Sequence, residues 1–265
     1  MSRTAMYRSE YGVIFRRLAF ADRRVLLLDY DGTIAPFSID RDRAFPFPAV
    51  PNLLARIMTK CRTRLIIVSD RRAHDLIPLL RIDPMPEIWG SHGMQRIHPD
   101  GRCEEAPMPG QVLQAVAQAV AELENAGLTE LIETKFACLA VHWRGLPASA
   151  ILEIRSKAYK VLEPLASQAD LLLVDFDGGI ALRPRLANKG GVIGTVLSEI
   201  GPDAPVAYLG DDATDEDAFR ALNGRGLTVR VGPKERFSAA QVWLRYPDEV
   251  IQFLTGWILA CGGDH

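Results

Sequence analysis

The segment Val25-Leu26-Leu27-Leu28-Asp29-Tyr30-Asp31-Gly32-Thr33 is an apolar run that ends at two aspartates, a glycine and a threonine. Four apolar residues in succession are typical of a parallel strand that is covered on both faces of its sheet. The glycine allows the backbone to turn where the strand ends. Because ligands bind beyond the carboxyl ends of the strands in open parallel sheets, we expect Asp29 and Asp31 to lie in a functional site.

Two distant segments repeat this pattern. The apolar run 65–68 is followed by Ser69, and the run 206–209 is followed by Gly210, Asp211 and Asp212. If these runs form parallel neighbouring strands, their polar residues converge on one pocket with Asp29. The sequence therefore predicts an α/β fold with a parallel sheet and one site at its carboxyl edge.

A second domain is expected between these segments. The composition changes at 107–110, and the stretch that follows contains a helix, strands, a second helix and a hairpin in turn. Such a series forms a layer of its own. We therefore predict a core formed by 1–107 and 185–265, and an inserted α+β domain at 108–184.

Composition excludes several classes of partner. The 265 residues include 31 basic and 33 acidic ones, so no positive excess is available to bind a phosphate backbone, and nucleic acid is not expected as a partner. No stretch has membrane-spanning length, and residues 1–20 do not resemble a signal peptide. The four cysteines are far apart and form no metal-binding pair. We expect a cytoplasmic monomer that binds no membrane.

The two aspartates after the first strand can carry phosphoryl-transfer chemistry. A carboxylate can attack phosphorus and form an aspartyl-phosphate, which is the role we predict for Asp29. Asp31 could protonate the leaving alcohol and later activate water. Because the two carboxylates repel each other, we expect a cation between them. The alternative is a strand that simply ends in a turn, since D-G-T is a common string.

A near copy of this segment occurs at Val174-Asp175-Phe176-Asp177-Gly178-Gly179. Its Asp-Gly pair is a strong signal for a hairpin turn, and another strand follows at once. We therefore assign the copy to a turn and not to a catalytic site.

Ser69 and Lys189 are candidates for contacts with phosphate. Ser69 could begin a helix, and helix N-termini attract anions. Lys189 lies in the first turn of a helix that Asn188 can cap, where a cation is disfavoured unless an anion is near. A serine at a helix cap and a solvated lysine are the ordinary alternatives.

The acidic segment from Asp211 to Asp217 has two parts. Asp211 and Asp212 directly follow a buried strand, and oxygen ligands at such a place suit Mg²⁺, which binds through one or two carboxylates and substrate phosphate. Asp215 and its neighbours fit the first turn of a helix, where acidic residues are stabilised without a functional role.

The inserted domain contains a second polar cluster. Glu133 and Lys135 are two residues apart, as are His142 and Arg144, so each pair lies on one face of its strand. One acid among three potential cations suits a phosphorylated, hydroxyl-rich ligand. A solvent-exposed sheet face is the alternative.

Taken in order, these residues and their surrounding strings resemble the trehalose-6-phosphate phosphatase family of the haloacid dehalogenase (HAD) superfamily over essentially the whole chain. The strings are L-D-Y-D-G-T, G-S-H-G, E-T-K followed by H-W-R, R-P-R with N-K-G, and G-D-D-A-T-D-E-D-A-F. The resemblance implies a HAD-like Rossmannoid core with an inserted cap domain that selects the substrate.

The resemblance also implies roles for individual residues. The catalytic residues would be Asp29, Asp31, Ser69 and Lys189. The ligands of Mg²⁺ would be Asp29, the backbone carbonyl of Asp31, and Asp211, with Asp212 and Asp215 supporting the metal waters. The sugar phosphate would be bound by Glu133, Lys135, His142, Arg144, His92 and Arg183.

Two positions depart from the family pattern. The usual Ser-Gly-Arg is Ser69-Asp70-Arg71 here, and the usual cap glutamate is replaced by Ala181 in the string A-L-R-P. The sugar therefore stays open: trehalose 6-phosphate is the first expectation, and sucrose phosphate or glucosylglycerol phosphate is the alternative. A receiver that is phosphorylated without turnover and an inactive sugar-phosphate sensor are candidates from other classes.

Overall fold

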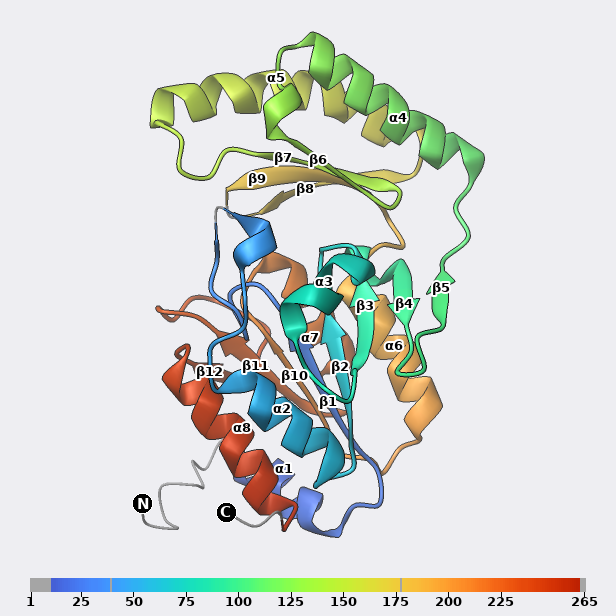
Figure 1. The fold of residues 1–265 in the computed structure, drawn as a ribbon. Coiled ribbons are helices and arrows are strands. Elements are labelled where there is room, and N and C mark those ends of the chain that lie inside the picture. Colours follow the sequence, from blue (N-terminus) through green and yellow to red (C-terminus); the bar gives the residue numbers. More distant parts are fainter. Residues whose placement is uncertain (1–10, 39, 177, 263–265) are drawn as a thin grey trace. The chain divides into compact units, whose positions relative to one another are not determined.

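The computed structural model describes residues 11–38, 40–176 and 178–262 (Figure 1). The chain forms two compact units. Unit 1 consists of Met1–Glu104 and Asn188–His265, and unit 2 consists of Glu105–Ala187.

Unit 1 is built on an eight-stranded sheet in the order β12-β11-β10-β1-β2-β3-β4-β5. The strands from β12 to β3 are parallel, and β4 is antiparallel to β3. The strands are β1 Arg24–Asp29, β2 Thr63–Val68, β3 Glu87–Gly90, β4 Gln95–Ile97, β5 Cys103–Glu105, β10 Val206–Gly210, β11 Leu227–Val231 and β12 Val242–Leu244. The predicted α/β class is confirmed, whereas the short edge strand β12 was not predicted because three residues carry almost no periodic signal.

Helices cover both faces of this sheet (Figure 1). Leu26 and Leu28 of β1 belong to the apolar cluster with α1, α2, α3 and α8, whereas Val25 and Leu27 belong to the cluster with α6 and α7. The helices are α1 Gly12–Phe20, α2 Val50–Thr59, α3 Ala73–Leu80, α6 Lys189–Ile200, α7 Glu216–Leu222 and α8 Asp248–Ala260, with 3₁₀ turns η2 Arg41–Arg43, η3 Ser91–Gly93 and η5 Ala213–Asp215. Alternate residues of β1 thus face opposite layers, which is why the strand is apolar throughout.

The three strands predicted to be parallel neighbours lie side by side. In the β1–β10 pair Leu28 is level with Leu209, and in the β1–β2 pair Asp29 is level with Val68. The residues that follow these strands therefore leave the sheet at the same edge.

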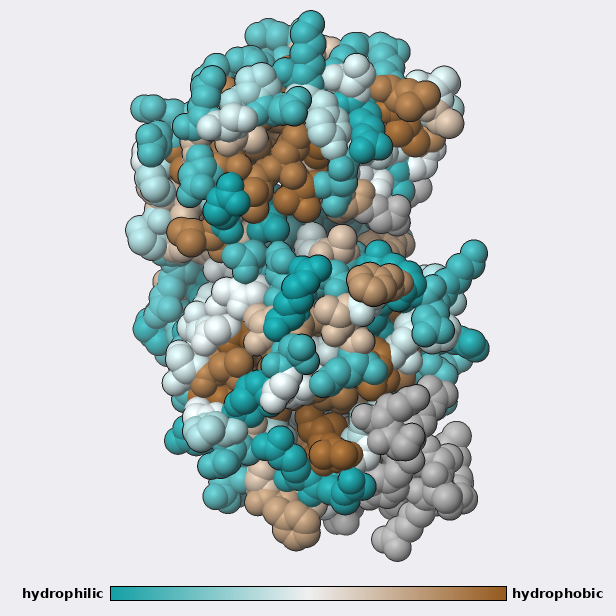
Figure 2. Space-filling model, turned by 180° about the vertical axis from the view of Figure 1, so that it is seen from behind, coloured by the Kyte–Doolittle hydropathy of each residue, from teal (hydrophilic) through white to brown (hydrophobic). Residues whose placement is uncertain are grey.

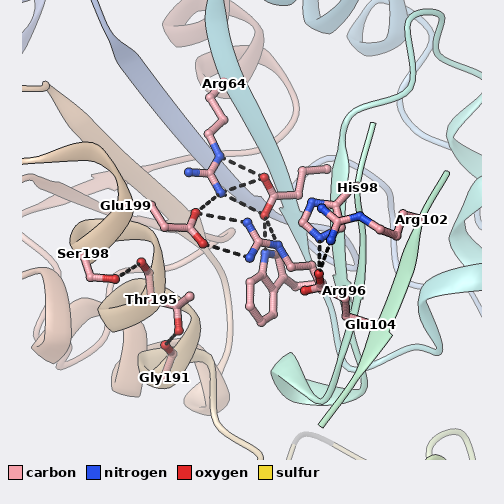
Figure 3. A network of polar contacts seen from close by, with 11 residues as sticks. Arg64, Arg96, His98, Arg102, Glu104, Gly191, Thr195, Ser198 and Glu199 are labelled. Atoms are coloured by element: carbon pink, nitrogen blue, oxygen red, sulfur yellow. Dashed lines mark hydrogen bonds and ion pairs between the residues drawn. The ribbon is translucent and has the colours of Figure 1, made fainter. Parts of the chain in front are cut away.

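A polar network in unit 1 connects β2, β3, β4 and α6 (Figure 3). Glu87 accepts hydrogen bonds from Arg64 at 2.9 and 3.1 Å and from Arg96 at 2.9 Å. Both arginines also contact Glu199, at 2.6 Å from Arg64 and at 2.9 and 3.0 Å from Arg96. Glu199 lies in the last turn of α6. The network therefore anchors the far end of the helix that begins with Lys189.

Unit 2 is a four-stranded antiparallel sheet in the order β6-β7-β9-β8, with α4 and α5 on one face (Figure 1). Its elements are α4 Gly110–Asn125, η4 Thr129–Leu131, β6 Ile132–Lys135, β7 Cys138–His142, α5 Ala148–Gln168, β8 Leu171–Phe176 and β9 Gly179–Pro184. Strands β8 and β9 pair directly, so the near copy of the first segment lies in a hairpin, as predicted. The turn residue Asp177 lies outside the described residues.

Among the helices that the structure describes, none is long and apolar enough to cross a bilayer. Hydrophilic side chains are spread widely over the face shown in Figure 2, with smaller groups of hydrophobic side chains between them.

Candidate active site

Gly32, which follows β1, lies against Asp211, which follows β10. Gly32 has a φ of +79°, and a Cβ atom there would lie 2.6 Å from Cγ of Asp211. Only glycine tolerates both the left-handed backbone and this close approach. The turn after β1 therefore brings Asp29, the last residue of β1, to the segment that follows β10.

Three carboxylates gather at this edge of the sheet. Oxygen atoms of Asp29, Asp211 and Asp215 all lie within 4.8 Å of one another. Both oxygens of Asp215 already accept hydrogen bonds: Oδ1 from Nζ of Lys189 and the hydroxyl of Tyr208, and Oδ2 from the backbone N–H groups of Asp211 and Asp212. The cluster of hard oxygen donors fits a divalent cation. Asp29 accepts from two donors and Asp215 from four, so Asp29 and Asp211 could bind a cation more readily than Asp215.

Lys189 is buried at the centre of the cluster. Its Nζ lies 2.5 Å from Oδ1 of Asp29 and 2.7 Å from Oδ1 of Asp215, and only 3% of its side chain is exposed. Asn188 caps the helix by accepting the N–H of Gly191 at 2.8 Å, as the sequence predicted. The alternative of a solvated lysine is therefore wrong.

The charges in this cluster shift one another's ionisation. Burial raises the pKa of Asp29 well above its usual range, against the opposing effect of Lys189. Burial also raises the pKa of Asp211 strongly, and the neighbouring carboxylates add to this rise. Burial alone would lower the pKa of Lys189, but Asp215 and Asp29 raise it well above its usual value. A bound cation would relieve the repulsion between the carboxylates.

Asp212 contacts the turn that directly follows it. Oδ1 of Asp212 accepts the N–H and the hydroxyl of Thr214 at 2.7 and 2.6 Å, and so caps η5. Asp215 completes this capping box and is fully buried. Its many donors show that Asp215 does more than stabilise a helix N-terminus.

The end of β2 differs from the expectation for Ser69. Helix α3 begins at Ala73, so Ser69 does not cap it. Ser69 is fully buried, and its hydroxyl accepts the N–H of Arg71 at 3.2 Å in a local turn. Its carbonyl accepts the N–H of His92 at 3.1 Å, which places His92 beside the same strand end.

The side chain of Asp31 points to a partner that sequence reasoning did not assign. Its two oxygens each accept a hydrogen bond of 2.7 Å from the guanidinium of Arg71. Two further residues were missed: the Thr33 hydroxyl donates to Oδ2 of Asp29 at 3.3 Å, and the Tyr208 hydroxyl donates to Asp215 at 2.5 Å. The phenol of Tyr208 within an otherwise apolar strand was a usable signal.

The polar residues of unit 2 share the sheet face that α4 and α5 do not cover. Nε2 of His142 lies 2.7 Å from Oε2 of Glu133, and Nζ of Lys135 lies 3.5 Å from the same oxygen. In the register, Glu133 is level with Ala140 and Ala140 with Ala181, so Ala181 and Arg183 belong to this face as well. Arg144 follows β7 and is exposed.

Comparisons with known proteins agree with this architecture. Residues 27–246 match the family model for trehalose-phosphatase. A trehalose-phosphate phosphatase of Mycobacterium marinum is 30% identical over 247 residues, which cover 87% of this chain and 60% of that protein. An uncharacterised glycosyl hydrolase of Mycobacterium tuberculosis is 30% identical over 262 residues, but the match spans only 19% of its length.

Solved structures show the same fold. The C-terminal domain of C. albicans trehalose-6-phosphate phosphatase has a TM-score of 0.77 at 22% identity, covering 94% of this chain and 96% of that one. A haloacid dehalogenase-like hydrolase from Bacteroides thetaiotaomicron has a TM-score of 0.64 at 16% identity, covering 88% and 99%.

Proposed function

The chain belongs to the trehalose-phosphatase family, and we propose that it hydrolyses a sugar phosphate monoester through an aspartyl-phosphate formed on Asp29. The observation that carries this proposal is the meeting of Asp29, Lys189 and Asp211 at one sheet edge from three distant segments. Asp29 can serve as the nucleophile, Lys189 is a cation held beside it, and Asp211 offers a carboxylate for a metal ion. Such a reaction uses all three groups.

The reaction would proceed in two steps. A carboxylate oxygen of Asp29 attacks phosphorus, while Asp31 gives a proton to the sugar oxygen that leaves. Asp31 then takes a proton from water, and the hydroxide attacks phosphorus to release phosphate and restore Asp29. Lys189, which already contacts Asp29, would neutralise charge on the phosphoryl oxygens, and we assign Ser69 to the same oxygens.

Mg²⁺ is the cofactor that we propose, held by Asp29, Asp211 and the backbone carbonyl of Asp31. When bound, it supplies positive charge where the transferred phosphoryl group is negative. Asp212 and Asp215 would orient its waters. Phosphate monoester hydrolysis requires accelerations of up to ~10²¹, so most of the barrier reduction has to come from such charges in a protected site.

We propose that unit 2 selects the substrate. Glu133, Lys135 and His142 form a connected polar group on one sheet face, and we assign Arg144 and Arg183 to the same group. For His92 of unit 1, a contact with the sugar phosphate stays a prediction from the family resemblance. A sugar hydroxyl can accept from the cations and donate to Glu133. Trehalose 6-phosphate is the first candidate because of the family match.

One observation favours another glycosyl phosphate as the second candidate. Ala181 occupies the uncovered face of β9, level with Ala140, and supplies no carboxylate to that face. A sugar phosphate that places no hydroxyl group against Ala181 would fit this difference, and sucrose phosphate and glucosylglycerol phosphate are the alternatives to test.

The test is phosphate release from a panel of phosphorylated sugars with Mg²⁺. We expect multiple turnovers with trehalose 6-phosphate and none after treatment with a chelator. Turnover with another member of the panel alone would select the second candidate, and a single turnover that stops at the phosphorylated protein would support a receiver. Gel filtration would test the expected monomer.

A further inference from the structure

The guanidinium of Arg71 donates three hydrogen bonds within unit 1. Its Nε and Nη2 each donate to a different oxygen of Asp31 at 2.7 Å, and Nη1 donates to the carbonyl of Arg41 at 2.7 Å. A two-pronged pair of this kind fixes both the position and the rotation of a carboxylate. Arg71 is buried, with 4% of its side chain exposed.

Arg71 itself is held by backbone contacts on two sides. Its N–H donates to the hydroxyl of Ser69 at 3.2 Å, and its carbonyl accepts the N–H of Ser91 at 2.6 Å. A Cβ atom on Gly90 would lie 2.8 Å from the Arg71 carbonyl oxygen, so glycine allows this approach. The arginine is therefore a rigid support for Asp31 and not a mobile surface side chain.

The pair keeps Asp31 apart from the other carboxylates. Asp31 follows Asp29 by two residues, yet the cluster within 4.8 Å contains Asp29, Asp211 and Asp215 and does not include Asp31. A further negative charge among these three would increase their repulsion. Arg71 turns the Asp31 side chain toward the end of β2 and toward the loop that contains Arg41.

Accordingly, we propose that Arg71 is a positioning residue that holds the carboxylate of Asp31 where it can exchange a proton with the leaving sugar oxygen. The proposal rests on the proposed function, because it assigns Arg71 to the acid/base step of that reaction. Arg71 does not contact the reacting atoms and acts only through Asp31.

This role predicts a dependence on the leaving group. A sugar alkoxide needs a proton as it departs, whereas 4-nitrophenolate leaves well without one. The ratio kcat/KM reports the steps up to departure of the alcohol, so it isolates the step that needs the acid. Loss of Arg71 should therefore harm hydrolysis of the sugar phosphate much more than hydrolysis of 4-nitrophenyl phosphate.

The experiment compares Arg71→Ala, Arg71→Lys and Asp70→Ala on trehalose 6-phosphate and on 4-nitrophenyl phosphate. We expect Arg71→Ala to lower kcat/KM for the sugar phosphate by about 10²-fold or more, and that for the aryl phosphate by less than about 3-fold. Arg71→Lys, which can form one contact in place of two, should recover part of the loss. Equal losses on both substrates would overturn the proposal.

Asp70→Ala is the matched control. Its carboxylate pairs with Arg41 at 3.5 Å, and both side chains are partly exposed, at 33% and 28%. Such a pair contributes little to stability, and Asp70 takes part in none of the three guanidinium hydrogen bonds of Arg71. This variant should keep both activities within about 2-fold.

A double variant separates positioning from folding. If Arg71 acts only through Asp31, Arg71→Ala in the Asp31→Asn background should cause no further loss, whereas independent effects would multiply. A multiplied loss in the double variant contradicts the proposal even where Arg71→Ala is less stable.

The outcome also distinguishes the two proposals. If the unmodified protein cleaves aryl phosphates but no sugar phosphate, the proposed substrate is wrong, and a series of aryl phosphates with increasingly poor leaving groups takes the place of the sugar. A steeper dependence on the leaving group in Arg71→Ala then supports the role of Arg71, and an unchanged dependence refutes it.

Discussion

The polar site at the edge of the unit 1 sheet and the polar face of unit 2 are built differently. In unit 1, Asp215 accepts hydrogen bonds from a lysine, a tyrosine and two backbone N–H groups. In unit 2, Glu133 contacts Lys135 of its own strand and His142 of the adjacent strand. The contacts of Asp215 join β10, α6 and the segment after β10, whereas these two contacts of Glu133 lie within one pair of strands.

This difference has a functional consequence. Groups that perform a fixed chemical step benefit from rigid partners, because reorganisation at the moment of reaction is costly. A face made of alternating strand residues can change one side chain without disturbing the core below it. Ala181, for example, lies on this face, and β9 pairs regularly with β7 and β8 on either side of it. We therefore expect substitutions in unit 1 to affect turnover and stability, and those in unit 2 to affect mainly substrate binding.

The largest effect is expected for Asp29→Asn. The amide cannot form the acyl phosphate at a useful rate, so we expect phosphate release to fall by about 10⁴-fold or more. Stopped assays with the best sugar phosphate would measure this, and circular dichroism would check that the variant folds. Retention of substantial turnover would assign the nucleophile elsewhere.

Lys189→Ala should combine a loss of activity with a loss of stability. It leaves the buried carboxylates of Asp29 and Asp215 without their shared cation, which costs about 3–5 kcal/mol of unfolding free energy for a buried pair. Denaturant unfolding would measure this. Lys157→Ala, which removes an exposed pair with Glu153 on α5, is the control and should leave stability almost unchanged. Similar losses in the two variants would contradict the contrast between the units.

Glu133→Gln tests the polar face of unit 2. The carboxylate is partly exposed, so we expect a change in unfolding free energy below about 1 kcal/mol. The loss of a charged hydrogen-bond partner for the sugar should raise KM by about 10-fold or more with a smaller change in kcat. Asp175→Asn, on the opposite sheet face, where Asp175 contacts Arg155 of α5, should leave KM unchanged. A fall in kcat with KM unchanged would remove Glu133 from substrate binding.

The smallest expected effect concerns pH and magnesium. The folded protein raises the pKa of both Asp29 and Asp211, so the metal-free protein loses stability as the pH rises from the unfolded pKa near 3.8 through the folded values. A bound divalent cation relieves this penalty, while protons compete with it at low pH. We therefore expect Mg²⁺ to raise Tm by a few degrees at pH 8 and by less at pH 5.5, at about 2–4 °C per kcal/mol.

Thermal unfolding with Mg²⁺ or a chelator at the two pH values measures this effect. Asp211→Asn is the matched variant, and its Tm should not respond to Mg²⁺. A Tm increase that is larger at the lower pH would contradict the assignment of the metal to these carboxylates.

Several features could be predicted because they depend on neighbours in the sequence. The apolar run of β1 required cover on both faces, Asn188 preceded a helix that it caps, and the Asp-Gly string after β8 indicated a hairpin. The expected alignment of β10, β1 and β2 followed from the same kind of pattern, repeated three times, and the pairing confirms it. The alternating polar residues of β6 and β7 share a face, as their period predicts.

Other features depend on contacts between residues that are far apart in the chain. The pair of Asp31 and Arg71 joins residues 40 positions apart, and the pair of Lys189 and Asp29 joins residues 160 positions apart. No local pattern distinguishes Asp215, which four donors hold, from Glu216 or Asp217 beside it. The amino-acid sequence determined which strand ends carry reactive groups, because strand period and turn chemistry are local. Tertiary packing decided which partner each charge received, because a buried charge has to be paired by whatever donors the folded core brings within reach.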